Sequence, residues 1–354
     1  MEKIRLGRTD MMVSRLGLGS IPLQRLPEEY AITIIRRSLD LGINFIDTAN
    51  AYTTSEERIG KAISGRREGI VLATKSQART REELENHLQL SLKQLGVEYI
   101  DLYQLHQVGD FETLDLVLEP NGLLDVLEGA KRAGVIKHIG VSSHQIDVAK
   151  ALVASDRFET IMFPLNFVTC EAADELLPLA REHDVGFIAM KPLAGGMLSN
   201  ATISFKYLFQ FPDVLPIPGI EETREIEEIV KLLEGAHEIS ALEQEEMQRL
   251  REELGTKFCR RCDYCQPCTQ EIPISFVLWF PTLADRIPLE TLMEGPLAGA
   301  IEKAGSCIEC GECEPRCPYH LPIREMVAES FKLYEAAKRK YQKQVSSKSK
   351  KRNN

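Results

Sequence analysis

The sequence has no run of about 18 apolar residues, the length that a helix needs to cross a bilayer, so we expect no membrane span. Residues 1–10 lack the apolar core of a secretory signal, which favours a cytoplasmic location with reducing conditions. Positive charge is also in deficit, because 43 Lys and Arg face 53 Asp and Glu and leave a net charge of −10. That balance disfavours nucleic acid as a partner.

Cysteine is almost absent from the first 258 residues, where Cys170 stands alone. The other eight of the nine cysteines form two short runs near the end of the chain. In a cytoplasmic protein such grouping indicates metal ligation rather than disulfides. The first run holds Cys259, Cys262, Cys265 and Cys268, and the second holds Cys307, Cys310, Cys313 and Cys317.

The spacing of the second run, C-x2-C-x2-C-x3-C-P, is the bacterial ferredoxin pattern for [4Fe–4S] ligation. In ferredoxins with two such runs, the fourth cysteine of one run binds the cluster of the other run. Zinc is the alternative, but zinc ribbons use two separated cysteine pairs. The first run departs from the pattern, since Thr269 follows its last cysteine and only two residues precede that cysteine. We predict one cluster on Cys259, Cys262, Cys265 and Cys317, and a second on Cys307, Cys310, Cys313 and Cys268.

Short apolar runs alternate with amphipathic helical stretches over residues 1–235, and the expected helices include 81–95, which ends at Gly96, and 172–183. Eight strand–helix units in about 230 residues predict an α/β fold of the (β/α)8 TIM-barrel type. The segments 4–6 and 11–13 predict a hairpin that covers the barrel floor. The expected strands are 16–19, 43–46, 70–74, 99–105, 136–141, 160–165, 186–189 and 214–217.

The rest of the chain divides into three expected parts. Residues 236–258 form a linker that contains a charged helix over 241–254. Residues 259–342 form an α-helical, ferredoxin-like iron–sulfur module with both cysteine runs, and its last helix covers 323–341. Residues 343–354, with five Lys or Arg and no acid, read as a disordered basic tail.

Polar side chains end several of the expected barrel strands. Asp47 follows the second strand, Lys75 ends the third and His106 ends the fourth, while Tyr52 lies in the loop after Asp47. Active sites of such barrels lie at the carboxyl ends of the strands. The four residues therefore form a candidate catalytic group.

These motifs resemble the aldo-keto reductase family. The segment Asp47–Tyr52, the lysine Lys75 after strand three and the segment Asp101–His106 match the catalytic tetrad of that family. The likeness covers about residues 4 to 233, and the cysteine-rich extension is similar to the subgroup with a C-terminal ferredoxin-like domain. The resemblance implies an oxidoreductase that interconverts a small-molecule carbonyl and an alcohol.

The chemistry of the four side chains agrees with this resemblance. The phenol of Tyr52 has an ordinary pKa near 10, and the ammonium group of Lys75 would lower it. Asp47 would keep Lys75 charged by ion pairing. Tyr52 would then give a proton to the carbonyl oxygen, and His106 would orient that carbonyl.

The nicotinamide cofactor is expected from the resemblance rather than from a Rossmann motif. Gly17-x-Gly19 lacks the third glycine of the dinucleotide fingerprint. The resemblance implies a cofactor across the barrel mouth, with Ser142 and Asn166 at its carboxamide and Met190 where many members have a stacking aromatic ring. Lys191 would meet the cofactor pyrophosphate or an acidic substrate, or be a solvated lysine.

The choice between the two nicotinamides depends on the segment after the last strand. Gly219 stands where members that prefer NADP place a polar or basic residue, and acidic residues follow it at 221, 222 and 225. These carboxylates would repel a 2′-phosphate, and only Arg224 would attract it. We therefore expect NAD(H) rather than NADP(H).

Three functions stay open at this point. The first is an oxidoreductase with tetrad chemistry and two [4Fe–4S] clusters as an electron relay, which leaves room for a redox partner protein. The second is an NAD(H)-dependent reductase whose clusters are purely structural. The third is a non-catalytic electron-transfer protein, against which the complete tetrad argues.

Overall fold

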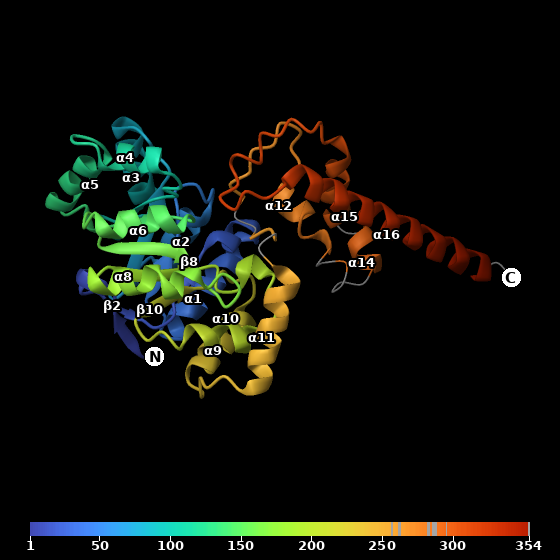
Figure 1. Ribbon diagram of the computed structural model, residues 1–354, viewed down its shortest axis with the longest axis horizontal. Helices are drawn as coiled ribbons and strands as arrows, with labels where there is room; N and C mark the ends of the chain where they lie inside the picture. Colours follow the sequence, from blue (N-terminus) through green and yellow to red (C-terminus); the bar gives the residue numbers. More distant parts are fainter. Residues whose placement is uncertain (256–257, 261–262, 282–283, 285–288, 295, 353–354) are drawn as a thin grey trace. The chain divides into compact units, whose positions relative to one another are not determined.

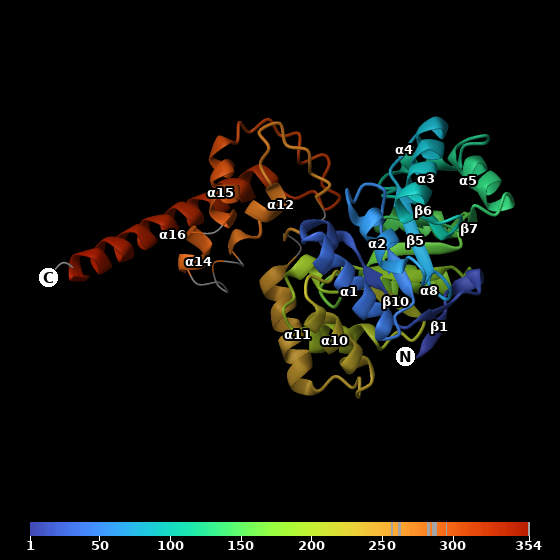
Figure 2. The ribbon, with the colours of Figure 1, turned by 180° about the vertical axis from the view of Figure 1, so that it is seen from behind.

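A computed structural model describes residues 1–255, 258–260, 263–281, 284, 289–294 and 296–352 (Figures 1 and 2). The chain forms two compact units. The first holds Met1–Ala194 and Leu198–Glu253, and the second holds Gly195–Met197 and Leu254–Asn354. The charged helix that the sequence places in a linker, residues 241–254, belongs almost entirely to the first unit.

The sheet of the first unit has eight strands, each paired in parallel with the next along the chain. All eight strands expected from the sequence are present, which confirms the predicted barrel. Parallel strands are covered on both faces, so they read as continuous apolar runs. They are β3 (Leu18–Gly19), β4 (Phe45–Asp47), β5 (Val71–Ser76), β6 (Ile100–Leu105), β7 (Ile136–Ser142), β8 (Thr160–Pro164), β9 (Gly186–Met190) and β10 (Val214–Ile217).

Backbone contacts between the first and last strands close the barrel. The amide of Gly17 donates to the carbonyl of Pro216 at 2.9 Å, and that of Gly19 donates to Pro218 at 2.8 Å. Gly19 also forms a parallel bridge with Gly219. A Cβ atom on Gly19 would lie 2.7 Å from the carbonyl oxygen of Ile217, so only glycine permits this closure.

We expect Gly19→Ala to lower the free energy of unfolding of the barrel by about 1–3 kcal/mol, the usual cost of overpacking. The clash is with backbone, which cannot rotate away as a side chain can. Thermal unfolding followed by circular dichroism measures the effect. Gly109→Ala is the matched control, because a Cβ there meets no atom within 4 Å. Equal melting temperatures for both variants would contradict the closure argument.

The helices around the sheet begin and end where the sequence provides caps. In helix α3 the side chain of Thr80 accepts a hydrogen bond from the amide of Glu83, and Gly96 ends the helix at φ 63°. The helical segments are η1 (Gly7–Thr9), η2 (Ile21–Arg25), α1 (Glu28–Asp40), α2 (Ser55–Ile63), α3 (Arg81–Leu95), α4 (Phe111–Leu118), α5 (Leu123–Arg132), α6 (Ile146–Ala154), α7 (Glu171–Asp174), α8 (Leu176–Glu182), η3 (Ala194–Gly196), α9 (Ala201–Leu208), α10 (Thr223–Leu233) and α11 (Ala241–Leu254).

The N-terminal hairpin covers the amino ends of the strands, as expected. Strands β1 (Lys3–Arg5) and β2 (Met12–Ser14) pair antiparallel. The amide of Arg8 donates to the carbonyl of Asp184, just before β9. Apolar side chains of the hairpin pack with those inside the barrel in one cluster. The hairpin therefore seals the floor and leaves the opposite end of the barrel for the site.

The second unit is helical. Among its described residues, the helical segments are α12 (Ile274–Val277), α14 (Leu289–Glu294), α15 (Pro296–Glu302), η4 (Lys303–Ser306) and α16 (Ile323–Arg352). Helix α16 continues through residues that the sequence predicts as a disordered tail. No glycine or proline lies between 323 and 352, so extending the helix costs little once it has begun. None of the described helices is both long and apolar enough to cross a membrane.

Candidate functional site

The four predicted catalytic side chains meet at the carboxyl end of the barrel. Asp47 ends β4, Lys75 lies in β5, His106 follows β6, and Tyr52 lies in the loop before α2. The Nζ atom of Lys75 is 4.9 Å from the centroid of the Tyr52 ring. The rings of Tyr52 and His106 lie edge to face, with centroids 6.0 Å apart. Strand pairing thus brings together residues that are far apart in the sequence.

Lys75 and Asp47 form a buried ion pair. Lys75 Nζ donates to Asp47 Oδ2 at 2.6 Å and to the carbonyl oxygen of Thr48 at 2.7 Å. Both side chains are almost inaccessible to solvent. Burial lowers the pKa of Lys75 and raises the pKa of Asp47, and the contact between the two opposes both shifts. Each charge is therefore stabilised mainly by the other.

His106 is buried and stays neutral near pH 7. Burial is the main reason why its pKa is well below the ordinary value of 6.5, and the positive charges of Lys75, Arg79 and Lys191 add to the effect. A neutral imidazole can donate a hydrogen bond from one ring nitrogen without adding a charge. Tyr52 is half-buried and is the most accessible of the four residues.

Two residues of this site are missed by reading the sequence. The side-chain amide of Gln104 donates to Asp47 Oδ1 at 3.2 Å from inside the barrel. The guanidinium group of Arg79 holds the loop of His106 by donating to the carbonyls of His106 and Gln107. An amide side chain next to the carboxyl end of the buried strand β6 was the available signal for Gln104.

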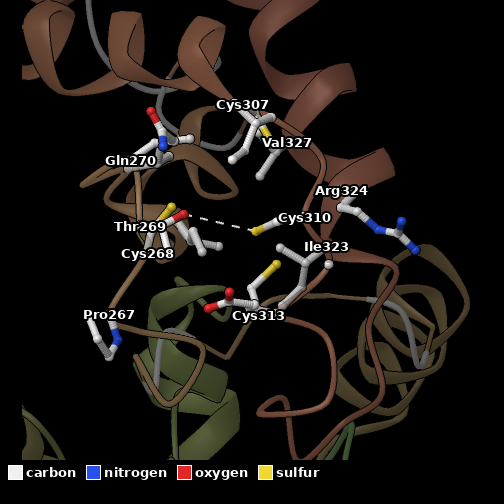
Figure 3. A pocket seen from close by; sticks show the side chains of 15 residues that line it. Pro267, Cys268, Thr269, Gln270, Cys307, Cys310, Cys313, Ile323, Arg324 and Val327 are labelled. Carbon is white, nitrogen blue, oxygen red and sulfur yellow. Dashed lines mark hydrogen bonds between the residues drawn. The ribbon is translucent and has the colours of Figure 1, made fainter.

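Cysteines from both runs line one pocket of the second unit (Figure 3). The thiol groups of Cys310 and Cys313 point into it, Cys268 of the first run lies across from Cys310, and Cys307 lies beside Val327. Apolar side chains of the same unit complete the wall, among them Ile274, Ile323 and Val327. The pocket therefore gathers the four residues predicted to hold one cluster.

The remaining predicted ligands lie in the same part of the unit. Cys265 and Cys317 are buried in one apolar cluster, against which Cys259 packs. Cys262 lies outside the residues that the structure describes. Among the residues that the structure does describe, no three His, Cys, Asp or Glu side chains converge as a single metal ion requires.

Comparison with known proteins agrees with this geometry. The sequence pattern of the Aldo/keto reductase family matches residues 15–204. The chain belongs to the aldo-keto reductase family. It is an oxidoreductase of that family with an additional domain, because the pattern of a 4Fe-4S dicluster domain matches residues 258–322.

Individual relatives cover the barrel of this aldo-keto reductase. The "Uncharacterized oxidoreductase YqkF" of Bacillus subtilis is 33% identical over 56% of this chain and 67% of its own length. An aldo-keto reductase of Bacillus halodurans, solved in its holo form, is 27% identical and has a TM-score of 0.61 over 71% of this chain and 96% of its own. An aldo-keto reductase of Klebsiella pneumoniae, solved in complex with NADPH, shares the fold at 23% identity, with a TM-score of 0.60 over 71% of this chain and 95% of its own.

The cysteine pocket fits the iron–sulfur group that the dicluster domain implies. Thiolates are the ligands of such clusters, and four from the two runs line this one pocket. The hydroxyl group of Thr269 lies 4.0 Å from Cys310 Sγ, within hydrogen-bonding range of sulfur. Thr269, where the ferredoxin pattern has proline, therefore contacts a predicted ligand.

The polar residues expected at the nicotinamide also fit that group. The side-chain oxygen of Ser142 accepts the amide of Gln107 at 2.9 Å, which leaves the hydroxyl hydrogen of Ser142 unused in that bond. Asn166 donates one amide hydrogen to the carbonyl of Lys191 at 3.0 Å and keeps a second. Met190 ends β9 directly before Lys191 and is largely buried. The side chains of Ser142 and Asn166 are thus each positioned by a hydrogen bond to the backbone, and each keeps a hydrogen that it can donate to the cofactor.

Gly219 precedes α10, and Arg224 lies in the first turn of that helix. A Cβ atom on Gly219 would lie 2.8 Å from the side chain of Pro22 in η2, so close packing against that segment accounts for this glycine. Arg224 Nε pairs with Glu222 Oε2 at 2.5 Å. The carboxylate of Glu225 accepts the amides of Glu221 and Glu222 at 2.7 and 2.9 Å. The helix N-terminus is thus capped by the chain's own carboxylates.

Proposed function

We propose that the chain reduces a carbonyl compound to an alcohol, and catalyses the reverse reaction, with Tyr52 as the proton donor. The arrangement of Tyr52, Lys75 and His106 around one point of the barrel mouth supports this proposal. The phenol is accessible while the three other side chains are buried. A small molecule at the mouth would therefore meet the phenol first.

Each residue of the site has a separate task in this proposal. The ammonium group of Lys75, fixed by Asp47, favours the phenolate form of Tyr52 and so makes the phenol a stronger acid. Neutral His106 donates a hydrogen bond to the carbonyl oxygen and orients it. When bound, a reduced nicotinamide would supply a hydride to the carbonyl carbon. In a separate relay step, the two electrons of one reduced nicotinamide, with release of a proton, would reduce two clusters by one electron each.

We also propose that the enzyme uses NAD(H) rather than NADP(H). The start of α10 supports this preference, because Glu225 occupies backbone amides that could otherwise bind a phosphate. Arg224 is paired with Glu222, so its charge is already compensated. A 2′-phosphate here would have to displace a carboxylate.

A relay role for the clusters is favoured over a purely structural one by the unequal exposure of the cysteines. Cys310 is exposed, and Ile308 beside it is 62% exposed, whereas Cys265 and Cys317 are buried. A cluster on the second run would thus lie near the surface of the unit, and one on the first run deeper. An accessible cluster can exchange electrons with a partner protein, which a purely structural cluster does not need.

Anaerobic purification followed by addition of NADH or NADPH tests these assignments together. We expect a brown protein with about eight iron atoms, as two cubanes require. NADH should bleach the visible absorption, and NADPH should do so more weakly. Calorimetric titration of each nicotinamide gives the affinity independently of any redox reaction.

Three results would change the proposal. Tighter binding of NADPH would overturn the cofactor preference. Bleaching by dithionite but by neither nicotinamide would indicate structural clusters or a foreign electron donor. A colourless protein containing zinc would remove the relay and leave the barrel chemistry alone.

A further inference from the structure

A second buried carboxyl group lies close to the catalytic lysine. Glu56 is 1% exposed and belongs to α2, the helix that begins directly after the loop of Tyr52. The amide of Ser55 donates to the carbonyl of Tyr52 at 2.8 Å, which joins that loop to the helix. Glutamate is almost never fully buried without a paired charge or a function.

Glu56 contacts the strand of Lys75 from the outside. Its Oε1 atom accepts a hydrogen bond from the hydroxyl group of Thr74 at 2.6 Å. Neighbouring side chains on a strand point to opposite faces, so Thr74 points to the helices and Lys75 into the barrel. Glu56 therefore lies on the outer side of β5, and the Lys75–Asp47 pair lies on the inner side.

The surroundings of Glu56 are polar. Besides Thr74, the hydroxyl groups of Ser91 and Tyr103 lie close to its carboxyl group. Tyr103 lies opposite Thr74 in the pairing of β6 with β5. Burial raises the pKa of Glu56, and burial together with the charge of Glu56 raises the pKa of Tyr103. A buried acid whose hydrogen-bond partners are hydroxyl groups rather than a cation requires an explanation.

We propose that Glu56 is a positioning residue that acts on Tyr52 through Lys75, from the outer side of strand β5. Lys75 is the charged group of β5, on the opposite face of that strand, and the charge of Glu56 counters the effect of burial on the pKa of Lys75. The facing group from β6 is Tyr103, and those from α3 are Ser91 and the titratable His87, whose Nδ1 lies 2.7 Å from the Ser76 hydroxyl group on the same face of β5. Arg58, on the same helix, donates instead to the carbonyl of Leu23.

The protonation state of Glu56 then tunes the site. When Glu56 is neutral, only Asp47 opposes the charge of Lys75, and the phenolate of Tyr52 is favoured. When Glu56 is ionised, two carboxylates oppose one ammonium group, and Tyr52 holds its proton more tightly. Groups that interact in this way lose their protons in linked steps.

The test is a pH titration of Tyr52 in the whole protein labelled with 13C at the tyrosine ζ carbons. The spectrum of Tyr52→Phe identifies the Tyr52 resonance. We expect that resonance to move in two steps in the unmodified protein and in one step in Glu56→Gln, because glutamine keeps the bond to Thr74 but cannot ionise. The inference refines the proposed function, yet this measurement needs neither substrate nor turnover.

Two further variants make the result decisive. Glu57→Gln, which removes the exposed acid next to Glu56, should keep both steps. Thr74→Val removes a hydrogen-bond donor that favours the ionised form of Glu56, so the first step in the titration of Tyr52 should move to higher pH. This variant tests the inference even if Glu56→Gln does not fold. A single step in the unmodified protein that is unchanged in Glu56→Gln would overturn the inference. Failure to find any carbonyl substrate would instead count against the proposed function.

Discussion

Replacement of Tyr52 by phenylalanine is expected to lower kcat for carbonyl reduction by about 10²–10⁴-fold, the usual contribution of a positioned acid. The ring remains, so its contacts with Lys75 and His106 persist and the substrate should bind almost as before. KM should therefore change little while kcat falls. Steady-state kinetics with a panel of aldehydes and ketones measures both quantities.

Tyr30→Phe is the matched control for this variant. Tyr30 is 38% exposed on α1 and should leave the kinetics unchanged. Affinity for the nicotinamide should be the same in both variants, which shows that the barrel mouth is intact. If Tyr52→Phe kept full activity, another residue would be the proton donor. If neither variant nor the unmodified protein reduced any carbonyl, the non-catalytic electron carrier would be the better description.

Cys268→Ser and Cys310→Ser should each cost one whole cluster, and the double variant should cost no more. We expect iron to fall from about eight to about four atoms in all three proteins, since each cubane holds four. The physical reason is that both thiols line one pocket although they belong to different runs. Iron analysis with electron paramagnetic resonance of the dithionite-reduced proteins measures the loss.

The double variant makes the pairing testable, because substitutions at one shared site are not additive. Loss of all iron only in the double variant would show that the two cysteines bind different clusters. Cys170→Ser is the control, because Cys170 lies in the barrel unit, outside both runs. It should retain about eight iron atoms.

Much of the barrel could be read from the sequence, and the exceptions have local causes. Helix α3 has the predicted bounds because Thr80 caps its start and Gly96 its end. The helix expected over 172–183 is instead two, α7 and α8. Pro178 lies in the first turn of α8, where its missing amide hydrogen is tolerated, whereas inside one longer helix it would break the hydrogen-bond ladder. Where one helix ends and the next begins depends on tertiary packing, which the periodicity of apolar residues in the sequence does not show.

The site was only partly readable for a different reason. Asp47, Lys75 and His106 follow apolar strands, so the rule that barrel sites lie at strand ends finds them. That rule does not find Gln104 and Glu56, because their roles depend on the side chains that they contact in the folded chain. The chemistry of a residue inside a strand depends on the face to which it points, and this follows from the register.

The meeting of Cys268 with the second cysteine run has a consequence for biosynthesis. If each cubane takes ligands from both runs, the ribosome must release the chain beyond Cys313 before the second cluster can be completed and beyond Cys317 before the first can. Helix α16, which packs on the same apolar cluster, is made later still. The barrel can therefore fold during translation, whereas the iron–sulfur unit can fold only after its clusters have been inserted. In iron-starved cells we would expect a nascent enzyme with a finished N-terminal unit and a protease-sensitive C-terminal one.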